Sequence, residues 1–251
     1  MKELGRQEVI FRDLGQMAYK DAWDFQEQLL QENVRKKTVN RELSIVNNEA
    51  TDSLLTVHHS PLTTEHHLLF VEHPPVFTLG KSGDAGNVLI SEEHLKMRGI
   101  DFFRTNRGGD ITFHGPQQIV GYPILDLERF YTDIGKYLRN IEEVIIRTLA
   151  EYGIIGDRSP GETGVWIDPH VKGRERKIAA IGVRSSRWVT MHGFALNVNT
   201  DLNYFNFIIP CGIQNKQVTS IEKELGHTVD FEEAKEKVKR NFEEVFEVKL
   251  I

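Results

Sequence analysis

The sequence predicts an α/β domain in which helices pack on one mixed sheet, and three observations predict it. Short apolar runs bounded by proline or glycine, such as residues 68–73 and 178–183, are typical of buried strands. Segments with apolar residues at helical spacing follow Asp133 and Asp230. The chain has 251 residues and is 39% hydrophobic, which is enough to bury one large core. We therefore expect a single domain over residues 1–251.

The first half of the chain is expected to contain a helix, a polar loop and two strands. Apolar residues near helical spacing predict a helix over residues 16–30. Residues 33–67 are polar, with paired lysines, asparagines and histidines, so we expect an exposed loop insertion there. Two adjacent prolines then separate the strands that we expect at residues 68–73 and 76–80.

The histidines of this polar stretch raise the question of a metal site. They form two adjacent pairs, His58-His59 and His66-His67. Adjacent residues do not place two imidazoles on one face of an element, and no carboxylate motif accompanies them. We therefore expect no metal site and interpret the stretch as a solvated loop.

The second half is expected to add strands and capped helices. A strand is expected over residues 119–127, and Asp133 stands where it could cap a helix that ends at Gly153. Thr219 and Asp230 are each followed by glutamate three residues later, which is the spacing of a capping box. The final helix is expected to bury a face made of Ala234, Val238, Phe242 and Val245. Further strands are expected at residues 164–167, 178–183 and 194–198.

Charge and hydropathy exclude several classes of partner. The net charge of -6 argues against binding to a phosphate backbone, so no nucleic-acid partner is expected. Residues 1–8 are polar where a signal peptide needs an apolar stretch, and no apolar run has the length of a membrane span. We expect a cytoplasmic protein with no membrane partner.

Cys211 is the only cysteine of the chain and lies in the turn-prone segment 209–213. A single thiol cannot form an internal disulfide, so its importance lies either in packing or in reactivity. A lone cysteine is most often an inert, buried side chain. The reactive alternative gains weight from a second segment, residues 107–123.

Residues 107–123 have the composition of a ligand-binding loop followed by a strand. Paired glycines, Gly108 and Gly109, let a backbone approach a ligand closely, and Thr112 and His114 add polar groups. The spacing matches neither the phosphate-binding loop G-x-x-x-x-G-K-[ST] nor the dinucleotide fingerprint G-x-G-x-x-G. No nucleotide cofactor is therefore implied.

The complete run resembles the signature of the lipoyl (octanoyl) transferases, the LipB family, in which R-G-G-x-x-T-x-H-G-P-G-Q precedes a strand containing Y-P. Gln117 stands where the family normally has glycine, so the family pattern does not fix the backbone geometry at that point, although no side chain expected to do chemistry is missing. Blocks of the family recur in the same order along most of the chain, which is more specific than any single block. They are residues 72–80, 177–182, 192–198 and 210–213.

The resemblance implies a fold like that of biotin and lipoate ligases, and an acyl transfer that needs no cofactor. The donor would be octanoyl-acyl carrier protein. The acceptors would be lysines of lipoyl domains, in 2-oxoacid dehydrogenase E2 subunits and in the glycine cleavage H protein. By the same resemblance, the acyl-substrate pocket would be formed by Arg107, Gly108, Gly109, Asp110, Ile111, Thr112, Phe113, His114, Ala180, Ile181, Gly182, Gly193, Phe194 and Ala195.

The resemblance makes Cys211 and Lys177 the catalytic pair. A free thiol with a pKa near 8.5 is only a few per cent thiolate at neutral pH, so a nucleophilic cysteine benefits from a neighbouring base or cation. Lys177 could stabilise the thiolate as an ammonium or accept the thiol proton as an amine, and the sequence leaves both open. Backbone amides near Gly108-Gly109, and near Gly182 or Gly193, are candidates for stabilising the oxyanion.

Three alternatives remain open at this point. A Cys-His hydrolase would use His114 or His192 as the base. An ATP-dependent lipoate-protein ligase would share the fold and the acceptor, but it would need ATP and a free acid and would not need Cys211. A non-catalytic module would bind the acyl group or the carrier protein without turnover, and Gln117 is the only feature that favours it.

Overall fold

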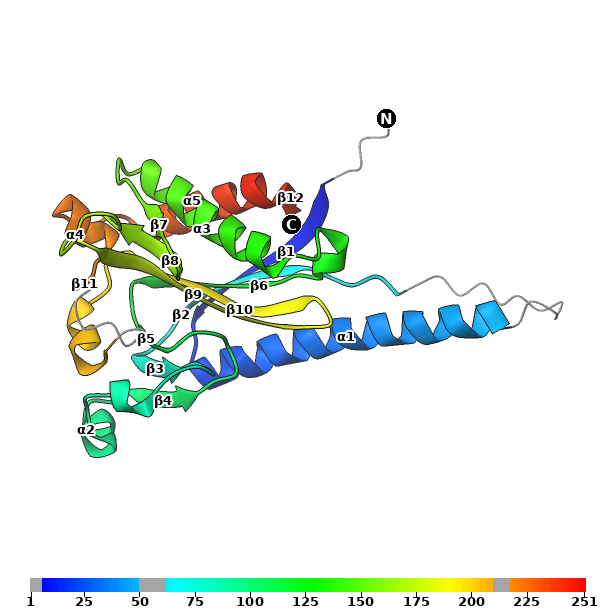
Figure 1. Cartoon of the computed structure of the whole chain (residues 1–251), viewed down its shortest axis with the longest axis horizontal. Helices are drawn as coiled ribbons and strands as arrows, with labels where there is room; N and C mark the ends of the chain where they lie inside the picture. Colours follow the sequence, from blue (N-terminus) through cyan, green and yellow to red (C-terminus); the bar gives the residue numbers. More distant parts are fainter. Residues whose placement is uncertain (1–5, 50–61, 210–216) are drawn as a thin grey trace.

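A mixed sheet forms the centre of the computed structural model, which describes residues 6–49, 62–209 and 217–251 (Figure 1). Its order is β12-β1-β2-β6-β10-β9-β8-β7, and β11 also pairs with β9. The pairs β12–β1, β1–β2 and β11–β9 are parallel and the others antiparallel, which confirms the predicted mixed sheet. The strands are β1 (Gln7–Gln16), β2 (His67–Glu72), β6 (Gln118–Ile124), β7 (Asp157–Ser159), β8 (Glu162–Ile167), β9 (Arg176–Ser186), β10 (Val189–Asn197), β11 (Gln217–Val218) and β12 (Val248–Leu250).

Helices cover both faces of this sheet (Figure 1). α3 (Ile134–Ala150) and α5 (Phe231–Phe246) pack together on one face, and α1 (Tyr19–Glu49) lies along the other. The strand β2 is buried on both sides because its side chains alternate between two apolar clusters. Leu68 and Phe70 join the cluster beneath α3 and α5, and neighbouring residues of the strand join the cluster beneath α1.

Two of the three predicted helix caps are confirmed. The carboxylates of Asp133 and Asp230 each accept a hydrogen bond, at 2.9 Å, from the backbone N–H three residues later. The prediction for Thr219 is wrong by one residue, because Ser220 caps α4 (Ile221–Leu225). The hydroxyl of Thr219 donates instead to a glutamate carboxylate, at 2.5 Å.

A second, three-stranded sheet lies beside the first and carries its own apolar cluster. Its central strand is β3, which pairs in parallel with β4 and antiparallel with β5. The loop between β4 and β5 contains the paired glycines, so this small sheet positions them. Its elements are β3 (Val76–Leu79), β4 (Asp101–Arg104), β5 (Ile111–His114) and α2 (Glu92–Met97). Among the described residues, the 3-10 helices are η1 (Ala85–Asn87), η2 (Leu127–Arg129) and η3 (Leu202–Phe207).

The long helix α1 corrects one expectation. Residues 33–49, which we expected to be part of an exposed loop, continue the helix without a break, and residues 50–61 lie outside the described residues. No proline or glycine interrupts residues 16–49, so nothing in the backbone stops the helix. In residues 33–42, whose side chains are described, polar groups of Asn33, Lys37 and Asn40 make most of the contacts with the body, which accounts for the polar composition there.

Two asparagines of α1 each make a pair of hydrogen bonds to the backbone of an extended segment, residues 62–65. Asn33 donates to the carbonyl of Glu65 at 2.7 Å and accepts from its N–H at 2.9 Å. Asn40 makes the same pair with Leu62, at 2.8 and 2.9 Å. Seven helical residues advance about 10.5 Å, and three extended residues advance about 10 Å, so the two spacings match.

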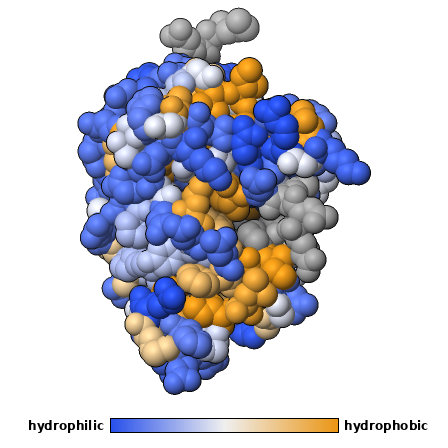
Figure 2. Space-filling model, turned by 90° about the vertical axis from the view of Figure 1, so that its left-hand side faces the viewer, coloured by the Kyte–Doolittle hydropathy of each residue, from blue (hydrophilic) through white to orange (hydrophobic). Residues whose placement is uncertain are grey.

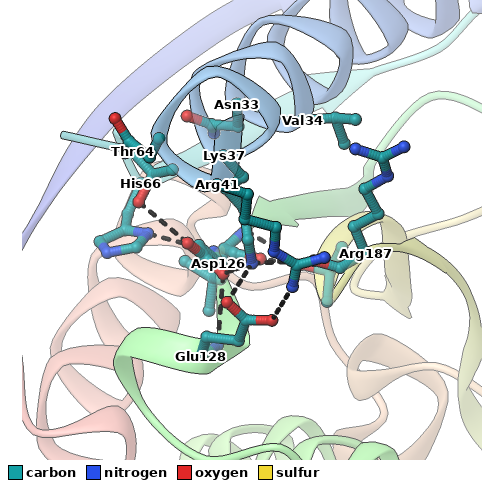
Figure 3. A network of polar contacts seen from close by, with 12 residues as sticks. Asn33, Val34, Lys37, Arg41, Thr64, His66, Asp126, Glu128 and Arg187 are labelled. Carbon is teal, nitrogen blue, oxygen red and sulfur yellow. Dashed lines mark hydrogen bonds and ion pairs between the residues drawn. The ribbon is translucent and has the colours of Figure 1, made fainter. Parts of the chain in front are cut away.

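The same part of α1 contributes Lys37 to a set of ionic and polar side chains that is buried except for Glu128. We call this set the charged network: Lys37, Thr64, His66, Asp126 and Glu128 (Figure 3). Lys37 Nζ lies 2.5 Å from a carboxylate oxygen of Asp126 and 3.0 Å from one of Glu128. Thr64 donates to the other Asp126 oxygen at 3.0 Å, and His66 Nδ1 accepts from the Asp126 N–H at 3.2 Å. Lys37 and Asp126 are only 6% and 3% exposed.

No helix among the described residues is both long and apolar enough to cross a membrane.

Candidate functional site

A cavity of about 580 Å³ lies between the small sheet and strands β6, β9 and β10 of the main sheet. Its volume is in the range of pockets that bind small organic ligands. All the predicted binding residues except Phe113 line this cavity, and so does Lys177. Figure 2 shows the side of the molecule that is at the left in Figure 1, where apolar residues gather in the middle of the face between hydrophilic regions. The structure thus brings together blocks that are far apart in the sequence.

Phe113 is the exception among these residues because successive side chains of β5 point to opposite faces. Its ring stacks on Tyr204 at 4.5 Å between ring centroids and packs in the apolar cluster of the small sheet. Thr112 and His114, on either side of it, line the cavity. Phe113 therefore supports the cavity wall from behind.

Arg107 organises the loop that carries the paired glycines, residues 107–110, which we call the glycine loop. Its guanidinium donates to the carbonyls of Thr78, Gly108 and Asp110, at 2.7, 3.0 and 2.9 Å. The side chain is only 7% exposed. A buried cation that donates to backbone carbonyls fixes the loop conformation and makes the electrostatic potential of this wall positive.

The glycine loop lies against β9 at a distance that only glycine permits. The N–H of Gly108 donates to the Val183 carbonyl at 2.9 Å. A Cβ added to Gly182 of β9 would lie 2.8 Å from the carbonyl oxygen of Gly108. On the other side of the loop, a Cβ added to Gly80, which follows β3, would lie 2.2 Å from the carbonyl oxygen of Gly109. The glycines thus allow two pieces of backbone to form one wall of the cavity.

Lys177 lies on β9, with its Nζ 4.6 Å from the centre of the Trp166 ring. The carbonyl of Lys177 accepts from the N–H of Thr219 at 2.9 Å, and Val218 of β11 pairs with Lys177 in parallel register. The predicted nucleophile Cys211 lies outside the described residues, so its distance from Lys177 is not defined. The described chain resumes at Gln217, in the strand that pairs with Lys177.

The chain before Cys211 is also attached near the cavity. The N–H of Ile209 donates to the carbonyl of Asn87 at 2.8 Å. The side chain of Asn87 in turn donates to the carboxylate of Asp110, at 2.7 Å. Ile209 is therefore two hydrogen bonds away from a cavity-lining residue and two positions before Cys211 in the sequence.

Histidines near the cavity are held neutral by burial. Burial, together with the nearby cations of Arg107 and Arg184, lowers the pKa of His192 to about 3. Burial likewise holds the pKa of His114 well below its usual range. Burial also lowers the pKa of His73 to about 4, although its hydrogen bond to the Met17 carbonyl opposes the shift. Such weakly basic imidazoles are poor acceptors of a thiol proton at neutral pH.

The backbone of Gln117 explains the glycine that the family normally has at this position. Gln117 has a φ of 61°, in the left-handed region that favours glycine. Its N–H donates to Glu72 at 2.9 Å, and its carbonyl accepts from Val198, Asn199 and Thr200 at 3.3, 3.2 and 2.9 Å. These contacts over-determine the backbone, so glutamine adopts the conformation that glycine would adopt.

Several cavity-lining residues were not among the predicted binding residues. Gln118 and Asn197 line the cavity, and both lie in the family blocks, which is a signal that could have identified them. Tyr19 also lines it, from the start of α1, and its ring stacks on His114 at 5.9 Å between centroids. No sequence signal identified Tyr19, because its contact depends on how the helix crosses the sheet.

The most similar proteins include octanoyltransferases of related length. The chain is 55% identical over 244 residues to the octanoyltransferase of Christiangramia forsetii, and the match covers 97% of both chains. It is also 55% identical over 244 residues to that of Flavobacterium psychrophilum, over 97% of this chain and 98% of that one.

The architecture also resembles solved structures of lipoate ligases. The bipartite lipoate protein ligase of Thermoplasma acidophilum has a TM-score of 0.60 at 17% identity, over 98% of this chain and 85% of that one. Lipoate-protein ligase A bound with ATP has a TM-score of 0.62 at 14% identity, over 99% and 88%. These likenesses confirm the expected lipoate-ligase fold.

Residues 18–243 match the model of the lipoyl protein ligase A/B catalytic domain. This match includes the glycine loop, Lys177 and Cys211, and it agrees with the resemblance that the sequence blocks indicate. The chain therefore belongs to the lipoyl protein ligase A/B catalytic domain family.

Proposed function

We propose that the protein transfers an octanoyl group from acyl carrier protein to a lysine of a lipoyl domain. The observation that carries the proposal is that the glycine loop, the other predicted binding blocks and Lys177 line one cavity, in a chain 55% identical to octanoyltransferases. Phe194, Ala195 and Ile181 give the wall apolar surface for an acyl chain. Arg107 lines the same cavity, and its positive charge favours the negative charge that develops on a carbonyl oxygen during acyl transfer.

The reaction consists of two acyl transfers through Cys211. In the first, the Cys211 sulfur forms a bond to the octanoyl carbonyl carbon, and the bond to the carrier thiol breaks. The proton lost by Cys211 passes to Lys177 and then to the departing thiolate. In the second, the acceptor amine forms an amide bond to the same carbon, and the bond between that carbon and the Cys211 sulfur breaks. The proton lost by the amine passes through Lys177 to the Cys211 thiolate and restores the thiol.

The energetics require no ATP. Exchange of one thioester for another is nearly balanced, and formation of an amide from a thioester is downhill. The donor thioester therefore supplies the whole driving force. This feature separates the proposal from a ligase, which activates a free acid.

Lys177 suits the role of proton acceptor better than the two histidines. It lines the cavity and lies on β9, the strand that pairs with β11. In the sequence, Cys211 is six residues before the first residue of β11. Burial lowers the pKa of His192 to about 3 and that of His114 well below its usual range. Because a base works best when its pKa lies near the working pH, these imidazoles are poorly matched to a thiol.

The ligase alternative has weaker support. The solved lipoate ligases share 14% and 17% identity with the chain, which indicates a common fold. The octanoyltransferases share 55% identity over nearly the whole length. An acyl transferase that keeps the ligase fold accounts for both likenesses.

Intact-protein mass spectrometry tests the proposal. The purified chain is mixed with octanoyl-acyl carrier protein without ATP, alongside the Cys211→Ser variant. We expect one octanoyl adduct that hydroxylamine removes and that the variant lacks. A folded protein that forms no adduct with a competent donor contradicts the proposal, and an adduct or product that appears only with ATP and octanoate supports the ligase.

Two variants of Lys177 test its role. Lys177→Ala is expected to lower the rate of Cys211 acylation by about 10²-fold to 10⁴-fold, the usual contribution of a general base. A Cys-His enzyme would keep most of its acylation rate in this variant. Lys177→Arg keeps a cation that cannot give up its proton. It should acylate well if the cation alone stabilises the thiolate and poorly if Lys177 accepts the proton.

A further inference from the structure

A chain of side-chain hydrogen bonds runs along the cavity wall from β11 toward the glycine loop. Asn197 Nδ2 donates to the Thr219 carbonyl at 2.9 Å, and Asn197 Oδ1 accepts from Gln118 Nε2 at 2.8 Å. Gln118 Oε1 lies 2.9 Å from His114 Nδ1, and His114 Nε2 lies 3.3 Å from the Thr78 hydroxyl. We call Thr78, His114, Gln118 and Asn197 the amide relay.

The direction of every bond in the relay follows from groups that can act in only one way. The Thr219 carbonyl can only accept, so Nδ2 of Asn197 must face it and Oδ1 must face Gln118. Gln118 Nε2 also donates to the Phe113 carbonyl at 3.1 Å, which fixes the Gln118 amide independently. The Gln118 oxygen therefore faces His114, and the proton of this bond is on His114 Nδ1.

The other end of the relay is fixed in the same way. Arg107 can only donate, and it donates to the Thr78 hydroxyl oxygen at 2.9 Å. Because the His114 ring is neutral and already carries its proton on Nδ1, its Nε2 has a free lone pair, and the Thr78 hydroxyl donates its proton to that nitrogen. His114 is thus a neutral imidazole with its proton on Nδ1, and both of its nitrogens have partners inside the protein.

The relay is buried and uncharged along its whole length. Thr78, His114, Gln118 and Asn197 are 0, 6, 1 and 3% exposed. Burial, together with the charge of Arg107 and the neighbouring His73 and His192, holds the pKa of His114 well below its usual range. Ordinary changes of pH therefore do not reverse the bonds.

The relay also connects to the strand that follows the predicted nucleophile. The same Thr219 whose carbonyl accepts from Asn197 donates its N–H to the Lys177 carbonyl at 2.9 Å. Thr219 directly follows β11, and residues 210–216, which include Cys211, directly precede β11. The position of Asn197 thus affects the register of β11 against Lys177.

We propose that Gln118 and Asn197 are positioning residues for the acyl transfer: they hold β11 in place relative to the glycine loop and keep His114 as the neutral Nδ1–H tautomer. The inference rests on the proposed function of Cys211 and Lys177. Its physical content is that both side chains act through an oriented set of hydrogen bonds and not through contact with the reacting atoms.

The first test measures the tautomer of His114 directly, by ¹⁵N NMR of the imidazole nitrogens in the wild-type protein. The His114 signals are assigned by their loss in His114→Gln. We expect a neutral ring with the proton on Nδ1 throughout pH 6 to 8. A proton on Nε2, or a charged ring at pH 7, overturns the inference. The result does not depend on whether the protein transfers octanoyl groups.

The second test uses Asn197→Asp and the pH dependence of acylation. A protonated carboxyl at position 197 can donate to the Thr219 carbonyl and accept from Gln118, so it restores the relay. An ionised carboxyl has no donor and repels the carbonyl. Burial favours the protonated form, so the pKa of the new carboxyl is raised. The ratio of variant to wild-type acylation rate should be near one at low pH and fall as pH rises.

The expected fall is about 100-fold between pH 6 and 8.5, because a small displacement of catalytic groups has effects of this size. Among the described residues, the charged groups near position 197 are Lys177, on the strand paired with β11, and Glu224, which bonds Thr219 and is paired with Arg176. Using the ratio of rates removes the pH dependence that wild type shares. A ratio that stays constant with pH overturns the positioning role.

Asn33→Asp is the matched control. Asn33 is 2% exposed and, like Asn197, donates Nδ2 to a backbone carbonyl, but it lies in the part of α1 that docks away from the cavity. Its ratio of rates should not change with pH. An equal fall in this variant would mean that any buried carboxylate has the effect, and it would also overturn the proposal.

A further variant keeps the test decisive if Asn197→Asp does not fold. Gln118→Glu places a carboxylate beside His114 Nδ1–H, so the pKa of His114 should rise and its ¹⁵N signals should titrate. Unchanged His114 signals in a folded Gln118→Glu protein contradict the relay. Wild-type protein that forms no octanoyl adduct rejects the proposed function alone, since the tautomer measurement still decides the relay.

Discussion

The charged network beneath α1, apart from Glu128, and the amide relay beside the cavity are both buried, but they differ in what holds them together. The charged network pairs Lys37 with Asp126 and Glu128, at 2.5 and 3.0 Å. The relay uses neutral groups whose direction is set by backbone carbonyls. A buried ion pair is costly to break, whereas a neutral relay is cheaper to break but geometrically specific. The first is therefore suited to stability and the second to orientation.

Breaking the charged network should have the largest effect on stability. Lys37→Ala leaves the buried carboxylate of Asp126 without its cation, and we expect a loss of about 3–5 kcal/mol in the free energy of unfolding. Denaturant unfolding measures it. Acylation by the fraction that remains folded should change little, because Lys37 lies outside the cavity.

A double variant separates the loss of the pair from the burial of one charge. Lys37→Met combined with Asp126→Leu removes both charges and should be less destabilising than Lys37→Ala alone. If the double variant is the less stable of the two, the network stabilises the fold by more than the pairing of its charges. Oriented hydrogen bonds would then matter in the network as they do in the relay.

Acidification should weaken the charged network through His66. Burial lowers the pKa of His66 from its ordinary value of 6.5 to about 4, with the Asp126 carboxylate opposing the shift. The unfolded state therefore binds more protons than the folded state between these values, and stability falls as pH drops below 6.5. We expect His66 to contribute a loss of about 2 kcal/mol at pH 5.

Unfolding in denaturant at pH 7 and pH 5 measures this loss. His66→Gln can still accept from the Asp126 N–H but cannot titrate, so its stability should depend less on pH than that of wild type. His227→Gln, at an exposed position, is the control and should keep the wild-type dependence. Equal pH dependence in His66→Gln and wild type would show that acid acts elsewhere.

Close packing of the glycine loop against β9 predicts that an added Cβ destabilises the fold at one glycine and not at another. The Cβ of Gly182→Ala would lie 2.8 Å from the Gly108 carbonyl oxygen, so the loop must move. We expect a loss of about 1–3 kcal/mol in the free energy of unfolding, the usual effect of overpacking. In Gly108→Ala the nearest atom would be the Val183 carbonyl oxygen at 3.4 Å, an ordinary contact, so that variant should be clearly more stable. Similar losses in both would argue against the close approach.

The sequence predicted the parts of the molecule whose local pattern and tertiary role agree. Asp133 and Asp230 cap their helices as their spacing indicates. The strand β2 has a continuous apolar run because both of its faces are buried. Blocks of residues that are far apart in the chain, and that carry the family resemblance, line one cavity.

The parts that could not be predicted depend on tertiary hydrogen bonds. Residues 33–49 are polar and were expected to be a loop, but Asn33 and Asn40 bind extended backbone and make a polar helix stable. The amide relay could not be predicted either, because the hydrogen bond from Asn197 to Thr219 depends on the pairing of β11 with β9. A single asparagine in a sequence does not reveal the carbonyl it will face.

The smallest effect concerns Gln117, where the backbone conformation and the side chain can be separated. Its left-handed φ of 61° disfavours any residue with a Cβ by about 1 kcal/mol, whereas glycine gains freedom in the unfolded chain worth about 0.4–1 kcal/mol. The Gln117 side chain also accepts a hydrogen bond from Asn199 at 2.9 Å, and replacement by glycine or alanine removes this bond. Gln117→Gly should therefore lie within about 1 kcal/mol of wild type in the free energy of unfolding.

Gln117→Ala provides the comparison that isolates the backbone. It keeps the left-handed strain and loses the same hydrogen bond, so it should be less stable than Gln117→Gly by up to about 1 kcal/mol. Thermal and denaturant unfolding of the two variants measure the difference. If alanine is the more stable, the contacts of the Gln117 backbone do not hold φ in the left-handed region. Gln117 directly precedes Gln118 in the chain, so such a result would also argue against a fixed backbone position for the Gln118 side chain in the relay.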